Sequence, residues 1–246
     1  MNLVSSLLLG IIQGLTEFLP VSSSGHLVLA QSLIPSFSQP GVLFDVTIHL
    51  GTLLAVVYFF RGKIVSLSKN YLMALVVGTI PAVLAGLVFG DFLESLFSSA
   101  RATALQLIAT GALNIFVDFL PKGMGEITLK NSIFMGIAQA VSIIPGISRS
   151  GATIFTGVAA RVERAKVAEF SFLLSIPAIL GAMVFQLGKY GFGAVENPLN
   201  YLVGFLASAV VGFFSISLVF KFLLGRQFKV FGIYAIVLGV AFLLLK

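Results

Sequence analysis

The sequence predicts an all-α, polytopic integral membrane protein that contains an inverted repeat. Of its 246 residues, 58% are hydrophobic and only 10% are charged, whereas soluble domains carry about 25% charged residues. The mean hydropathy is +1.09. Several uncharged apolar windows approach the length of a membrane span, and two similar polar segments occur at matching places in the two halves of the chain. Together these observations favour a helical bundle with lipid as its solvent.

Six windows qualify as membrane-spanning helices. A bilayer core of about 30 Å requires roughly 20 apolar residues per helical span. The windows are Val42 to Phe60, Tyr71 to Gly90, Ala102 to Leu120, Phe170 to Gly188, Asn200 to Phe220 and Val230 to Leu245. The last is slightly short, and the first and third contain acidic residues, Asp45 and Asp118.

Composition also excludes several classes of protein. The chain has no cysteine, so disulfides and thiolate chemistry cannot contribute. Its net charge of +6 comes from Lys and Arg placed between apolar stretches, and nucleic-acid binding would need a basic patch on a soluble face. The first nine residues lack a basic region and a cleavage site, so we interpret them as mature structure and not as a signal peptide.

The repeat is a segment of mixed apolar and polar residues. Gly10 to Gly25 aligns with Gly136 to Gly151, with identical residues at six positions. In each copy the apolar stretch after the polar loop, Leu27 to Leu33 or Ala152 to Ala160, is too short to cross a bilayer. We therefore expect a re-entrant helix-loop-helix followed by three transmembrane helices in each half, about 1–121 and 122–246, of a single membrane domain. One interrupted span per segment is the alternative.

Basic residues decide between these two topologies. If each polar segment returns to its own side, eleven Lys and Arg residues face one compartment, and only Arg101, Lys189 and Lys246 face the other. If each segment crosses once, the same residues divide evenly, against the positive-inside rule. The returning topology puts both termini outside. It inverts one half relative to the other, so that the polar loops meet near the midplane, where inverted-repeat proteins build their sites.

A carboxylate within the first segment predicts a cation site. Gln13 and Glu17 are four residues apart in a helical stretch, which places them on one helix face. Hard cations such as Mg²⁺ and Ca²⁺ take carboxylate and amide oxygens, and ionisable groups inside membranes are usually functional. A purely structural role, in which Glu17 accepts hydrogen bonds from the nearby serines, is the alternative. Asp45 and His49, on the next helix, are candidates for supporting roles.

Two Ser/Gly-rich turns resemble anion-binding cradles. A turn that leads into a helix N-terminus offers free backbone N–H groups and the positive end of the helix dipole. Arg149 adds a planar guanidinium that matches phosphate oxygens. The candidate substrate-binding residues are Ser22, Ser24 and Gly25 in the first turn and Gly146, Ser148, Ser150, Gly151 and Thr153 in the second. Such turns alone often only break or pack helices.

The candidate nucleophile is Ser23, three residues before His26. A hydroxyl beside a base is the general pattern of an activated nucleophile, although His26 can equally be a hydrogen-bonding partner. A metal-bound water with His26 as base is the close alternative. The combined charges favour a phosphate or diphosphate ligand with a divalent cation, and the apolar walls favour a ligand with a hydrocarbon tail.

At these residues the chain resembles the undecaprenyl pyrophosphate phosphatase family, the bacitracin-resistance membrane proteins of bacteria. QGLTEFLPVSSSGH resembles the family's (E/Q)xxxE and Ser-Ser-x-Gly-His segment, PGISRSGAT resembles PGxSRSxxT, and EFSFLL is similar too. Gln13 in place of Glu lies within the pattern but removes one charge from the cation site.

The resemblance implies hydrolysis of undecaprenyl diphosphate to undecaprenyl phosphate and inorganic phosphate, with a divalent cation. This reaction would recycle the lipid carrier for peptidoglycan synthesis. From the residues themselves we predict Glu17, Ser23, His26 and Arg149 as the catalytic residues. We expect a multi-pass protein of the bacterial plasma membrane whose site opens to the outer face. Phosphatidic-acid phosphatases fail on spacing, because the histidine they require would fall at Phe155. A lipid flippase or small-molecule transporter is the alternative from another class. The sequence carries no signal for the number of subunits.

Overall fold

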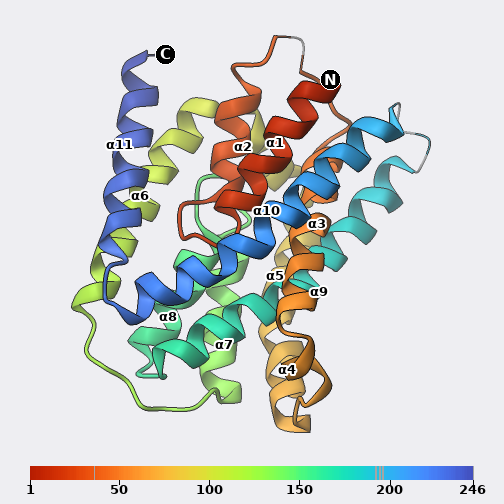
Figure 1. Cartoon of the computed structure of the whole chain (residues 1–246). Coiled ribbons are helices and arrows are strands. Elements are labelled where there is room, and N and C mark those ends of the chain that lie inside the picture. The colour runs from red at the N-terminus through yellow and green to blue at the C-terminus, as the bar shows by residue number, and fades with distance from the viewer. Residues whose placement is uncertain (36, 192, 194, 196, 246) are drawn as a thin grey trace.

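The computed structural model describes residues 1–35, 37–191, 193, 195 and 197–245, and it is α-helical with short connections (Figure 1). The first helices are α1 (Leu3–Thr16), α2 (Ser23–Gln31), α3 (Leu43–Phe59), α4 (Arg61–Val65), α5 (Lys69–Ser95), the 3-10 turn η1 (Leu96–Ser98) and α6 (Ala100–Phe119). They are followed by α7 (Leu129–Val141), α8 (Arg149–Ala159), α9 (Arg164–Tyr190), α10 (Pro198–Leu224) and α11 (Lys229–Leu245).

The prediction of a polytopic helical membrane protein is confirmed. Each of the six predicted windows corresponds to one helix, namely α3, α5, α6, α9, α10 or α11. Within the described residues, four helices, α5, α6, α9 and α10, are long and apolar enough to cross a membrane, and α1, α3 and α11 are shorter apolar helices. The short helix α4 and the turn η1 were not predicted.

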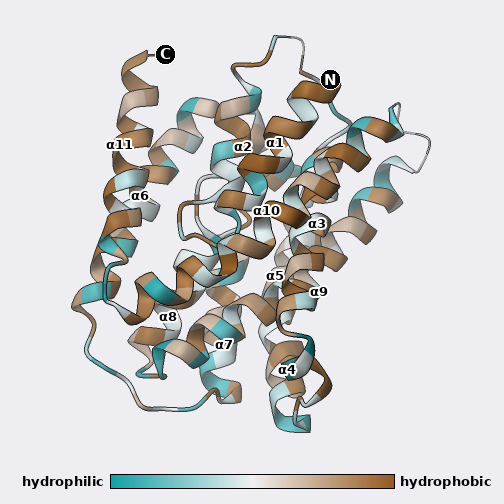
Figure 2. Cartoon of the chain, viewed as in Figure 1, coloured by the Kyte–Doolittle hydropathy of each residue, from teal (hydrophilic) through white to brown (hydrophobic). Residues whose placement is uncertain are grey.

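The outer surface of the helices is apolar. Large side chains such as Leu87, Val184 and Phe214 are 67%, 73% and 70% exposed, and Figure 2 shows hydrophobic residues along the flanks of α10 and α11. Soluble monomers rarely expose continuous apolar surface on this scale, and such surface marks contact with another apolar phase. Here that phase is the lipid of a membrane, because the exposed residues lie on helices of spanning length.

Close helix crossings depend on glycine. Helix α1 packs on α10, and α7 packs on α5. A Cβ atom added to Gly10 would lie 3.0 Å from the Cα of Gly204, and one added to Gly136 would lie 3.1 Å from the Cα of Gly78. Small residues allow membrane helices to approach backbone to backbone, so a larger side chain at Gly10 or Gly136 would push these helices apart.

One end of the bundle is joined by polar contacts between helix ends. The buried Arg164 guanidinium at the start of α9 donates to the Val117 and Leu120 carbonyls at 2.9 and 3.2 Å. The Asp118 carboxylate accepts from the backbone N–H groups of Phe228 and Lys229 at 3.1 and 2.9 Å. In Figure 1 the two labelled termini lie at the top, opposite the end that carries α4. Lys246 lies outside the described residues.

Candidate active site

The connections α1–α2 and α7–α8 come together inside the bundle. The Ser150 hydroxyl donates to the Leu19 carbonyl at 3.2 Å. The Arg149 Nη2 atom donates to Glu17 Oε1 at 2.8 Å, across 132 positions of sequence. Two segments that are remote in the chain therefore build one polar site.

Helix α6 holds both connections from the side. The Asn114 side-chain amide donates to the Pro20 carbonyl. The Thr110 hydroxyl donates to the Gly146 carbonyl at 2.7 Å and accepts from the Ser148 N–H at 3.0 Å. Gly146 has a φ of +89°, a conformation that favours glycine, and a Cβ there would lie 2.7 Å from the Cβ of Gln106. This glycine therefore shapes the connection.

Glu17 is the centre of the site. Its side chain is only 4% exposed, and it accepts from Gln13 Nε2 at 2.9 Å, as their four-residue spacing predicts. The Ser23 hydroxyl donates to it at 2.6 Å, and His49 Nε2 lies 3.3 Å away. With Arg149, these groups surround both carboxylate oxygens. A buried charge needs such partners, because removing it from water without them is costly.

Arg149 is held in a fixed orientation at the start of α8. Its Nη1 atom donates to the Ser171 carbonyl of α9 at 2.9 Å, while Nη2 binds Glu17. The guanidinium is planar and carries its donors in a rigid fork. Two anchored nitrogens therefore fix the plane in which this fork can meet an anion.

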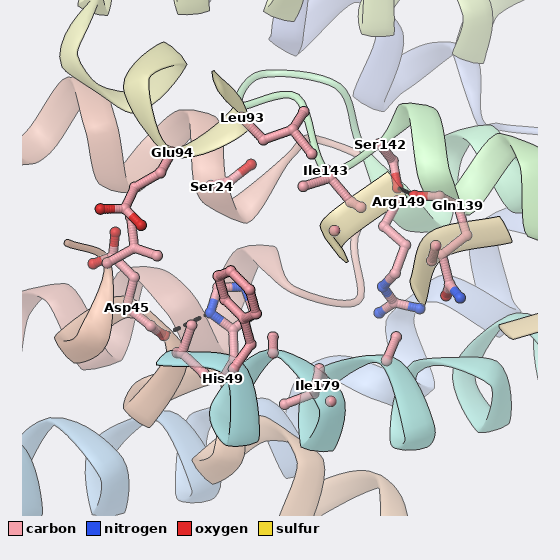
Figure 3. A pocket seen from close by; sticks show the side chains of 18 of the residues that line it. Ser24, Asp45, His49, Leu93, Glu94, Gln139, Ser142, Ile143, Arg149 and Ile179 are labelled. Atoms are coloured by element: carbon pink, nitrogen blue, oxygen red, sulfur yellow. Dashed lines mark hydrogen bonds between the residues drawn. The ribbon is translucent and has the colours of Figure 1, made fainter. Parts of the chain in front are cut away.

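The polar site forms the floor of a cavity of about 320 Å³. The floor includes Glu17, Ser23, Asp45, His49, Gln139 and Arg149, and apolar walls come from α5 and α9. Figure 3 shows Arg149, Gln139 and Ser142 on one side of this cavity and Asp45 and Glu94 on the other. A cavity of this size, with few polar groups among apolar walls, is typical of a small-ligand site.

The predicted serine turns also have structural roles. Ser22 and Ser148 are the N-caps of α2 and α8, and each accepts from the glycine N–H three residues on, Gly25 at 3.2 Å and Gly151 at 3.1 Å. Ser22, Ser24 and Ser148 line the cavity. In the described part of the chain, the other predicted binding residues are not in the lining: Gly25, Gly146, Ser150, Gly151 and Thr153. They shape and support the turns.

The structure does not bring His26 to Ser23. The His26 ring lies 2.8 Å from the Ser22 carbonyl through Nδ1 and 2.9 Å from the Tyr234 hydroxyl through Nε2. It also stacks on the Tyr234 ring at 5.6 Å. Among the described residues, no hydrogen bond joins His26 to Ser23. The imidazole that lies beside Glu17 and lines the cavity is that of His49.

Sequence reasoning did not select several cavity residues, namely Gln139, Ser142, Glu94 and Gln186. The sequence contained a signal for only one of them, because Gln139 is the repeat equivalent of Gln13. Glu94 and Gln186 sit near the ends of long apolar helices, where polar residues commonly contact the membrane surface. Their place in the lining follows from the way α5 and α9 pack.

The oxygen atoms of Glu17 and Gln13 are compatible with the coordination of a hard cation that also binds a substrate. Glu17 offers carboxylate oxygens, and Gln13 Oε1 is buried without a hydrogen-bond partner in the described ranges. Oxygen ligands of these kinds suit Mg²⁺ and Ca²⁺. The described residues contain no cluster of three or more acidic, histidine or cysteine side chains arranged for a metal. The substrate or water would therefore supply the remaining ligands.

Fold and site together define an integral membrane protein with an internal polar site for an anionic ligand, bounded by apolar walls. Residues 6–241 match the family described as "Bacitracin resistance protein BacA", and the chain belongs to this family. It is 39% identical to "Undecaprenyl-diphosphatase 4" of Bacillus thuringiensis subsp. konkukian, over 100% of this chain and 98% of that protein. It is also 37% identical to "Undecaprenyl-diphosphatase" of Methanobrevibacter smithii, over 98% and 96%, and 38% identical to that of Carboxydothermus hydrogenoformans, over 100% and 98%.

Proposed function

We propose that this chain hydrolyses undecaprenyl diphosphate to undecaprenyl phosphate and inorganic phosphate. The contact between Arg149 and Glu17, at the floor of an apolar-walled cavity, carries this proposal. It places an anion-binding fork and a carboxylate together in a chain whose relatives are named for this reaction. In a bacterial cell the activity would return the lipid carrier to peptidoglycan synthesis, which supports cell shape and resistance to bacitracin.

Ser23 is the proposed nucleophile. Its hydroxyl already donates to Glu17 at 2.6 Å, so Glu17 can accept the proton as Ser23 Oγ attacks the terminal phosphorus. The bond from that phosphorus to the bridging oxygen then breaks, and the lipid monophosphate leaves with that oxygen. Water attack on the phosphoserine would break its P–Oγ bond, release inorganic phosphate and restore the hydroxyl. Arg149 would bind the non-bridging oxygens, because phosphoryl transfer depends mainly on positioning and charge neutralisation.

The contacts favour different roles for the two histidines. His26 contacts the Ser22 carbonyl and Tyr234, which supports a positioning role for the turn that carries Ser23. His49 lies 3.3 Å from Glu17 and can exchange a proton with that carboxylate or stabilise its charge. The sequence-based hypothesis that His26 is the base remains a prediction, and substitution of each histidine separates the two roles.

A divalent cation is the proposed cofactor. Glu17, with Gln13, would hold it, and the ion would neutralise charge on the phosphoryl oxygens. Gln13 Oε1 supports this assignment because the oxygen is buried and has no partner among the described residues. Among the described residues, the ionisable groups at contact distance from the Glu17 carboxylate are the Arg149 guanidinium and the His49 imidazole, so the charge around the carboxylate would change when substrate and ion enter together.

The lipid tail is proposed to leave the site between α5 and α9. The cavity walls there include Val83, Leu87 and Ile179. A second apolar groove of about 490 Å³ continues along the same two helices, and Val83 lines both. An apolar path of this kind suits an isoprenoid chain, because it buries hydrocarbon beside the polar floor without exposing backbone groups.

The proposed architecture is an inverted repeat with halves of about 1–121 and 122–246. In the repeat, α1 is equivalent to α7, and α5 is equivalent to α10. Each of these helices packs on a helix of the other pair: α1 packs on α10, and α7 packs on α5. Gly10 and Gly136 are repeat equivalents, as are Gly204 and Gly78, and the glycines meet in the same exchanged pairs. Such an exchange is expected of a pseudo-two-fold axis.

The proposed re-entrant segments follow from helix length. Helices α1 and α7 have 14 and 13 residues, or about 20 Å at 1.5 Å per residue, and this is shorter than a bilayer core. Their connecting turns would therefore lie at membrane depth. With the basic residues of α4 and the neighbouring connections facing the cytoplasm, both termini lie outside the plasma membrane.

Phosphate release from a C55 diphosphate tests the proposed function. The purified protein in detergent should release inorganic phosphate, and a chelator should stop the release until Mg²⁺ or Ca²⁺ is added back. An Arg149→Ala variant is the matched control for contaminating phosphatases. Detergent removes the two compartments that transport requires, so a protein that only moves lipid would release no phosphate.

A further inference from the structure

Gln139 occupies an unusual position in the cavity. It lies in the last turn of α7, is 2% exposed and lines the cavity, and Figure 3 shows it on the same side as Arg149. Both its amide nitrogen and its amide oxygen are buried without a hydrogen-bond partner among the described residues. A buried amide left in this state is unfavourable, and its NH₂ group can donate two hydrogen bonds. The cavity is the place where it can find a partner.

Comparison with Gln13, its repeat equivalent, explains why Gln139 is free. Gln13 Nε2 donates to Glu17, four residues later, at 2.9 Å and lies 3.4 Å from the Thr52 hydroxyl. The residue four positions after Gln139 is Ile143, which also lines the cavity but offers no acceptor on its side chain. The amide nitrogen of the glutamine therefore has acceptors within the protein in one copy, whereas in the other copy it has none among the described residues.

We propose that Gln139 binds a phosphoryl oxygen of the diphosphate group together with Arg149. This inference rests on the proposed function for the identity of the ligand. An anion is the fitting partner, because it can accept from the Gln139 amide and also pair with the charge of the Arg149 guanidinium. Amide N–H groups also bind phosphate without adding charge, so Gln139 orients the substrate while Arg149 neutralises it.

The test uses two substitutions at this position. Gln139→Met keeps the size of the side chain and removes both polar atoms, and Gln139→Glu keeps the shape but replaces the donor with a negative acceptor. Thr103→Val is the matched control, because Thr103 Oγ1 is also buried without a partner in the described chain but lies outside the cavity lining. The measurements are kcat/KM for a C55 diphosphate, the inhibition constant of a non-hydrolysable methylene bisphosphonate, and Tm.

We expect Gln139→Met to lower kcat/KM and weaken bisphosphonate inhibition by about ten- to a hundredfold, the range for a hydrogen bond to a charged group. Its Tm should not fall, because an unsatisfied buried amide is removed. Gln139→Glu should bind the bisphosphonate more weakly still, because it repels an anion. Thr103→Val should match the wild type in all three measurements.

Two results would overturn the inference. In the first, kcat/KM and the bisphosphonate inhibition constant of Gln139→Met both stay within about twofold of wild type. In the second, Gln139→Met loses activity and has a lower Tm, but binds the bisphosphonate as the wild type does. A wild-type protein that releases no phosphate, but binds the bisphosphonate in a Gln139-dependent way, would refute the proposed hydrolysis and support the binding role.

Discussion

The ion pair between Arg149 and Glu17 can be tested by exchanging each charged side chain for glutamine, singly and together. Arg149→Gln leaves the Glu17 carboxylate buried, at 4% exposure, with His49 as its remaining ionisable partner. Glu17→Gln leaves Arg149 more accessible, at 14% exposure, and still bonded to the Ser171 carbonyl. The first substitution should therefore be the more destabilising of the two.

The distance between the charges sets the magnitude. At 2.8 Å and an effective dielectric constant of about 20, the Coulomb attraction is about 6 kcal/mol before desolvation. Breaking one side of a buried pair typically costs about 3–5 kcal/mol. The hydrogen bonds from Gln13 and Ser23 to Glu17 remain, so we expect about 3 kcal/mol for Arg149→Gln. At roughly 2–4 °C per kcal/mol, Tm should fall by about 6–12 °C.

The double variant separates stability from catalysis. Replacing both charges removes the unpaired carboxylate, so Tm should return to within about 3 °C of wild type. Phosphate release should stay at least about a thousandfold below wild type in all three variants, because arginine contacts in phosphoryl transfer contribute factors of that size. Thermal unfolding in detergent and phosphate release from a C55 diphosphate measure the two effects. Additive Tm changes would refute the coupling of Arg149 with Glu17, and a double variant that turns over substrate would refute their catalytic role.

Three further predictions concern the nucleophile, the tail and the topology. Ser23→Ala should abolish phosphate release if Ser23 forms a phosphoserine, whereas slow turnover that still responds to a chelator would indicate attack by water. If Glu17 and His49 transfer the proton, His49→Gln should lower kcat more than His26→Gln does. Val83→Trp should raise KM for a C55 diphosphate much more than for a C15 diphosphate, and an equal effect on both would exclude a tail path past Val83. A single cysteine placed in the segment 61–70, which contains α4, of this naturally cysteine-free chain should resist an impermeant thiol reagent in intact cells, and labelling there would contradict the proposed orientation.

The sequence by itself determined the class of the fold and singled out several polar groups that the structure brings together at the cavity. Membrane spans are predictable because a bilayer responds to the summed hydropathy of about 20 consecutive residues, which is a local property, and each of the six windows became one helix. Glu17 and Arg149 were identified because a charge inside an apolar segment stands out from its neighbours. The recurrence of the Ser/Gly turns directed attention to both connections at once.

Only the tertiary structure decided which of these groups meet. Ser22 and Ser148 turned out to cap helices, and His26 contacts Tyr234 of α11 while His49 reaches Glu17. The direction of a side chain depends on the rotation and crossing of its helix against other helices, and these come from distant parts of the chain, as Tyr234 does for His26. Gln139 illustrates the same point, because its sequence matches Gln13, and only the packing of α7 beside Arg149 leaves its amide facing the cavity without a partner among the described residues.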